Sequence, residues 1–144
     1  MNETGQGAVA KHPSDLYPRG QQIPVLAERY FKVAIVFLLL GLLVGLHMSI
    51  SNNHSAHAAH AHINLVGWVT SALFGVYYAL HPVKADTRLA TAQFWIYVAG
   101  CVVMLPMLYF LVTGNESVEP LVAAGSMLVF LGILLFAVVV FSNE

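Results

Sequence analysis

The chain has 144 residues, of which 58% are hydrophobic and only 9% are charged, and its formal net charge at pH 7 is −1. Soluble domains carry about 25% charged residues, so this composition excludes an ordinary water-soluble domain. The mean hydropathy of +0.74 indicates that lipid is the solvent for most of the chain. The lipid bilayer is therefore the first expected partner.

The N-terminal residues 1–28 are polar and rich in Gly, Pro and Gln, and we expect them to form a flexible cytoplasmic tail. They do not resemble a cleaved signal peptide, which has a short apolar stretch near its start. Residues 29–144 are predicted to be a membrane domain with helices at about 30–49, 60–80, 92–113 and 120–141. Each run has about 20 residues or slightly more, which at 1.5 Å per residue spans the hydrocarbon core of about 30 Å. The predicted fold is an all-α bundle of four transmembrane helices.

The basic residues predict how this bundle is oriented. All six lie before or at the start of the first run or between the second and third: Lys11, Arg19, Arg29, Lys32, Lys84 and Arg88. The positive-inside rule places these segments in the cytoplasm. We therefore expect both termini to be cytoplasmic. The 51–59 loop would then lie on the opposite side, which is the periplasm if the protein resides in a bacterial inner membrane.

Small residues recur at helical spacing in the first two runs. Gly41 and Gly45 are four apart, and the second run carries a longer ladder of Gly67, Ser71, Gly75 and Ala79. Such residues let helices approach closely in lipid. The two ladders are expected to provide separate close-packing faces, which one four-helix bundle cannot use fully unless a cofactor fills one, and this favours a homo-oligomer. Gly125 and Gly132 in the fourth run are seven apart and predict one packing seam.

The chain has seven histidines, and five of them lie at one depth on the non-cytoplasmic side: His47, His54, His57, His60 and His62. Ionisable residues at membrane depth are costly and mark functional sites. Imidazole is a common ligand for haem iron, copper and zinc. His54 and His57 fit solvated loop residues, whereas His47, His60 and His62 lie where apolar runs begin or end. These three are the candidate iron ligands.

Helical geometry separates two of these candidates. Residues two apart on a helix point about 200° apart around its axis, so His60 and His62 face opposite sides and do not easily bind one metal ion together. His60 continues the face of Asn64, Gly67 and Ser71, on which a porphyrin plane could lie. One histidine could bind while the other donates a hydrogen bond, or the two could serve different sites.

The stretch His60-Ala-His-Ile-Asn-Leu-Val-Gly-Trp68, followed by Ala72-Leu-Phe-Gly-Val-Tyr-Tyr-Ala-Leu-His-Pro82, resembles the second helix of subunit I in the haem-copper oxidase superfamily. It is most similar to the nitric-oxide-reductase and cbb3-like branches. The resemblance implies that a histidine here is an axial ligand of a low-spin b-type haem. His62 matches that ligand by its spacing to Asn64, and His60 matches it by its spacing to Gly67 and Trp68.

The chain also departs from that family. A full catalytic subunit has about twelve helices, whereas the third and fourth runs here contain no histidine. The second low-spin ligand, the high-spin haem ligand and the copper ligands have no counterparts, and the membrane runs carry no carboxylates to relay protons. The chain is therefore not expected to act alone as an oxidase, and whether it is an enzyme stays open.

Three functions follow from these patterns. The first is a b-type haem protein that transfers electrons or binds NO or O2, with its second ligand from His47 or a neighbouring protomer. The second is a copper or zinc site in the loop, built from His54, His57, His60 and His62, with help from Met48. The third is a structural accessory subunit. We expect a respiratory-chain redox partner for the haem protein and no nucleic-acid partner.

Overall fold

The computed structural model describes residues 23–142, which form helices joined by short turns. Four helical spans in this part of the chain are long and apolar enough to cross a membrane: Val25–Ser51, His57–Leu80, Arg88–Val112 and Glu116–Phe141. This confirms the predicted all-α fold with four membrane helices. Residues 1–22 of the expected tail lie outside the described residues.

Each of the four spans begins before the apolar run that predicted it, because hydropathy marks only the part of a helix that matches the hydrocarbon core. The elements are α1 (Val25–Ser51), α2 (His57–His62), η2 (Ile63–Thr70), α3 (Ser71–Leu80), α4 (Pro82–Ala85), α5 (Arg88–Val112), η3 (Glu116–Val118) and α6 (Glu119–Phe141). α1 begins inside the segment that was expected to be tail. The second span, defined as His57–Leu80, consists of α2, η2 and α3, and η2 is a π-helix.

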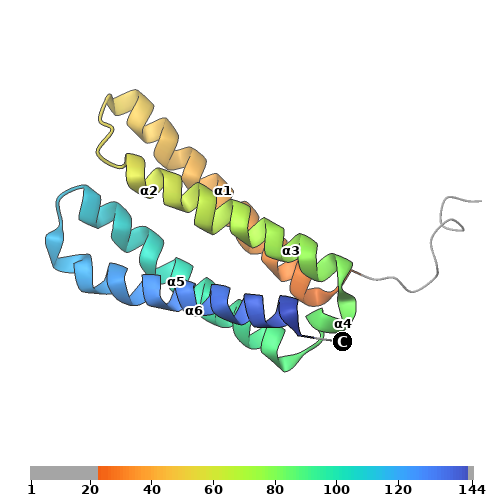
Figure 1. Ribbon diagram of the computed structural model, residues 1–144. Coiled ribbons are helices and arrows are strands. Elements are labelled where there is room, and N and C mark those ends of the chain that lie inside the picture. The colour runs from red at the N-terminus through yellow and green to blue at the C-terminus, as the bar shows by residue number, and fades with distance from the viewer. Residues whose placement is uncertain (1–22, 143–144) are drawn as a thin grey trace, which may run out of the picture.

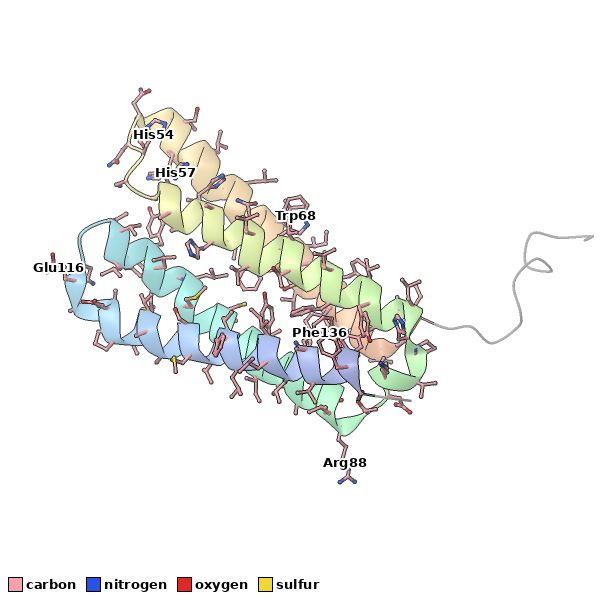
Figure 2. The ribbon with its side chains drawn as sticks, viewed as in Figure 1. His54, His57, Trp68, Arg88, Glu116 and Phe136 are labelled. Atoms are coloured by element: carbon pink, nitrogen blue, oxygen red, sulfur yellow. The ribbon has the colours of Figure 1, made fainter. Side chains whose placement is uncertain are left out.

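The spans are arranged as two helical hairpins that lie side by side (Figure 1). One hairpin pairs α1 with the second span, and the other pairs α5 with α6. The start of α1, α4 and the end of α6 lie at one end of the molecule, which we call the basic end because it carries Lys84 and Arg88. His54, His57 and Glu116 lie at the opposite end (Figure 2), which we call the histidine end.

The small residues of the first hairpin meet in a single interface. A Cβ added at Gly41 would lie 2.6 Å from Oδ1 of Asn64, and one added at Gly45 would lie 2.8 Å from Cε1 of His60. On the second span, a Cβ at Gly67 would lie 2.7 Å from Cγ of Phe37. The expectation of two separate packing faces is therefore wrong, because the two ladders face each other.

The second hairpin is joined through glycines of both its helices. A Cβ added at Gly125 would come within 2.6 Å of the backbone nitrogen of Met104, and one at Gly132 within 2.7 Å of Cβ of Tyr97. Both glycines therefore lie on the α5 side of α6. This confirms the predicted seam along the fourth span.

Contacts at the basic end hold the hairpins together. Phe136 of α6 lies among the rings of Phe74, Tyr77 and Tyr78 of α3 (Figure 2), with 4.1 Å between the Phe74 and Phe136 centroids. The ammonium of Lys84 in α4 donates to the carbonyl oxygens of Val140, at 3.1 Å, and Ser142, at 3.0 Å. A cation at a helix C-terminus interacts favourably with the carbonyls exposed there.

Candidate functional site

The five candidate histidines lie at the histidine end but differ in exposure. His47 near the end of α1, His54 in the turn, and His57 and His62 of α2 are exposed, whereas His60 of α2 is half-buried. Figure 2 places His54 and His57 at the tip of the first hairpin. The structure thus gathers these imidazoles at one end of the molecule without burying any of them fully.

His60 joins the second span to α1. Its Nδ1 lies 2.9 Å from the carbonyl oxygen of Gly41, and its ring packs over Gly45. A carbonyl oxygen can only accept, so Nδ1 donates the hydrogen, and in the neutral ring Nε2 is then the nitrogen that carries the lone pair. The carbonyl of Gly41 therefore fixes both the tautomer and the orientation of this ring.

Asn64 packs on the same face as His60, one turn further along. Its Nδ2 donates to the carbonyl oxygen of His60 at 2.8 Å, and its amide group covers Gly41 of α1. The side chain therefore fills the space that the glycine leaves. Asn64 contributes to the contact between the two helices.

His62 is fixed in a similar way but stays accessible. Its Nδ1 lies 2.8 Å from the carbonyl oxygen of Ala58 in the same helix, so Nε2 again carries the lone pair. The side chain is exposed, in contrast to that of His60. A histidine that ligates a metal usually donates its second ring hydrogen to a carbonyl or carboxylate, which fixes the ring and raises its basicity.

The structure does not bring the histidines together around one metal. His47 lies two residues beyond Gly45, and this spacing turns it about 200° away from the contact with His60. In residues 23–142, no three His, Cys, Asp or Glu side chains converge as ligands. The copper or zinc site expected from His54, His57, His60 and His62 is therefore not assembled, and the Met48 side chain is buried.

The small-residue face below His60 does not offer a cradle for a porphyrin. Gly67 is covered by Phe37 of α1. The Ser71 side chain is fully buried, and its Oγ has no hydrogen-bond partner among the described residues. A haem lying against Gly67 and Ser71 would have to displace α1. The exposed imidazole of His62 does have the donor chemistry that haem iron requires.

The π-helix η2 begins directly after His62. The hydrophobic periodicity of the sequence does not predict this element. Side chains bind two of its carbonyls: the hydroxyl of Tyr97 in α5 donates to Val66 at 2.7 Å, and that of Thr70 donates to Leu65 at 2.7 Å. π-Helices are rare; they occur mostly as single-turn bulges inside α-helices and are frequent at functional sites. The element therefore marks the middle of the second span, next to His62, as a specialised region.

A buried polar centre near the basic end was also missed. Oε1 of Gln93 in α5 accepts hydrogen bonds from the hydroxyls of Tyr30 in α1, at 2.5 Å, and Tyr78 in α3, at 3.2 Å. Its Nε2 donates to the carbonyl oxygen of Gly132 in α6 at 3.3 Å. One side chain thus links all four spans. The sign of this centre in the sequence is the polar residue Gln93, which lies near the start of the third apolar run.

No protein-family model matches this chain, and no curated protein or solved structure is similar to it. The site is therefore interpreted from its own geometry.

Proposed function

We propose that the chain is a membrane-bound b-type haem protein related to subunit I of the haem-copper oxidases. It would transfer electrons or bind NO or O2, in contact with a respiratory-chain partner, and would not be a complete oxidase. The observation that carries this proposal is the state of the imidazoles in the His60-Ala-His62 stretch. Both rings are fixed through Nδ1, and the Nε2 lone pair of His62 belongs to an exposed side chain.

The two histidines have different roles in this proposal. His62 is the axial ligand because its ring is exposed at the start of the second span. His60 is a positioning residue that ties α2 to α1 through Gly41. A bound haem would supply one-electron chemistry or a position for a diatomic gas, and the chain would supply the imidazole.

A second axial ligand would come from outside the chain. His47 points away from the side of α1 that His60 contacts, and the described residues contain no converging ligand set. A second copy of the chain, which carries the same exposed His62, would supply an imidazole of the same kind. The proposed second ligand would therefore require a homo-oligomer, for a reason that does not involve the glycine ladders.

We also propose that the basic end faces the cytoplasm of a bacterial inner membrane and the histidine end faces the periplasm. The basic residues Arg29, Lys32, Lys84 and Arg88 all lie in segments at one end of the bundle, and the turns at the other end contain no Lys or Arg. This distribution is typical of the positive-inside rule.

Absorbance spectroscopy of protein expressed with haem supplied tests the function. We expect a Soret band in the wild-type protein and its loss in His62→Ala, because the substitution removes the iron ligand. His54→Ala is the matched control, since it removes another exposed imidazole at the same end, and it should keep the band. Wild-type protein without a Soret band would overturn the cytochrome proposal.

His60→Ala separates the two histidines. It should keep the Soret band but lower the free energy of unfolding by about 1–3 kcal/mol, because Gly41 loses its partner and a cavity forms between α1 and α2. A variant that is as stable as wild type but has lost the band would instead identify His60 as the ligand.

A further inference from the structure

A cavity of about 410 Å³ opens at the basic end. It lies between the start of α1, α4 and the start of α5, and it is lined by Pro24, Val25, Leu26, Arg29, Pro82, Ala85, Asp86 and Thr91. Its volume falls in the range of small-molecule sites, which is about 300–1,000 Å³. The cavity is remote from the histidine end and has no part in the proposed haem site.

Two opposite charges line this cavity without pairing with each other. Arg29 comes from α1 and Asp86 follows α4, and both are exposed. In the described part of the chain, the ion pair joins Glu28 and Lys32, with 2.7 Å between their charged atoms. Arg29 and Asp86 therefore both line the cavity without forming an ion pair, so the cavity offers one positive and one negative side chain.

The other residues that line the cavity are consistent with a position at the membrane surface. Val25, Leu26 and Pro82 are apolar, and the cavity sits where two membrane helices begin. A ligand that satisfies this lining must therefore tolerate apolar surface and carry both an anionic and a cationic group.

We propose that the cavity binds the headgroup of phosphatidylethanolamine from the adjacent leaflet. The guanidinium of Arg29 pairs with the phosphate, because its planar donors suit phosphate oxygens. The carboxylate of Asp86 accepts hydrogen bonds from the primary ammonium. The apolar lining faces the glycerol and the first carbons of the acyl chains.

The same groups discriminate against other phospholipids. The trimethylammonium of phosphatidylcholine has no N–H to donate to Asp86, so it loses the hydrogen bonds. Phosphatidylglycerol has no cation, so it leaves the carboxylate of Asp86 without a partner beside the anionic phosphate. The chain would thus prefer the ethanolamine lipid over both.

Binding of lipids to delipidated full-length protein in mild detergent tests this proposal. The three lipids carry identical acyl chains, and affinity is measured by native mass spectrometry. We expect Asp86→Asn to weaken phosphatidylethanolamine binding by about tenfold and to abolish its preference over phosphatidylcholine. Arg29→Gln should weaken all three lipids. Lys32→Gln, which removes a neighbouring exposed cation outside this cavity, should leave the order unchanged.

Two kinds of result would overturn the proposal. One is equal affinity of the wild-type protein for the three lipids, or an unchanged preference in Asp86→Asn. The other is a preference that emerges only after residues 1–22 are deleted, which would make the N-terminal segment the occupant of the cavity. Neither result depends on haem, so the outcome is independent of the Soret measurement.

Discussion

Gln93 shows how much one polar residue can determine inside a membrane protein. Its amide accepts from two tyrosine hydroxyls and donates to a backbone carbonyl, so its oxygen and nitrogen are both hydrogen-bonded although the side chain is fully buried. With no water in the hydrocarbon region, partners must come from the protein itself. The arrangement fixes the rotation of each span relative to Gln93.

We therefore predict that Gln93→Leu lowers the free energy of unfolding by about 1–3 kcal/mol, because Tyr30 and Tyr78 lose their acceptor while remaining buried. Titration with sodium dodecyl sulfate from mild detergent micelles measures the change. Tyr30→Phe removes only one donor and should cost less, about 0.5–1.5 kcal/mol. Equal stability of Gln93→Leu and wild type would show that the hydroxyls find other partners.

For single residues, the sequence predicted which face of a helix a side chain occupies better than it predicted which group that side chain contacts. The prediction that His60 and His62 point to opposite faces agrees with the structure, since His60 contacts α1 and His62 is exposed. The partner of His60 could not be predicted, because it is a backbone carbonyl whose location depends on how α1 is rotated. The contact of Gly67 with Phe37 could not be predicted either, because it also depends on how α1 is rotated.

Among the helices, the second span departs most from expectation. A helical period of 3.6 residues was assumed along its whole length, and this places small residues on one face. The π-helix from Ile63 to Thr70 changes that period locally. Its stabilising bonds involve Tyr97, which is distant in sequence, so a local pattern could not predict it.

Helix packing yields a prediction that distinguishes two glycines. At Gly125 an added methyl group meets the backbone of Met104, which cannot rotate away, whereas at Gly41 it meets the side-chain amide of Asn64, which can. We expect Gly125→Ala to cost about 3 kcal/mol of unfolding free energy and Gly41→Ala about 1 kcal/mol. The same detergent titration measures both.

Ser126→Ala is the control for this comparison. It changes the neighbouring exposed residue on α6 and should alter stability by less than about 0.5 kcal/mol. A larger loss for Gly41→Ala than for Gly125→Ala would contradict the view that backbone contacts determine the cost.

For the whole molecule, hydropathy was sufficient to predict four spans and the approximate position of each. Every run of about 20 apolar residues became a helix, since lipid leaves backbone groups no other partner. The pairing into two hairpins was not predictable, because each span is apolar on most of its surface. Phe136 lies against α3, and no periodic pattern in α6 marks it as the contact residue.

The proposed orientation predicts which loops can be labelled from outside the cell. In a Cys101→Ala background, Ser55→Cys should react with a membrane-impermeant thiol reagent on intact spheroplasts, and Thr87→Cys should react only after lysis. Both positions are exposed, so accessibility reports the side of the membrane. Labelling of Thr87→Cys on intact spheroplasts would reverse the proposed topology.

The hydrogen bonds from Lys84 to the carbonyls at the end of α6 also imply that the two hairpins are joined late in synthesis. Lys84 precedes Val140 by 56 residues, and at about 5–20 residues per second the ribosome needs about 3–11 s to reach these carbonyls. During that interval the ammonium lacks these two acceptors and keeps the hydroxyl of Tyr77, at 3.4 Å, as its partner within the first hairpin. The two hairpins therefore lock at this end only after the carbonyls of α6 arrive, and a nascent chain stalled before Val140 would expose Lys84 to chemical modification that the finished protein resists.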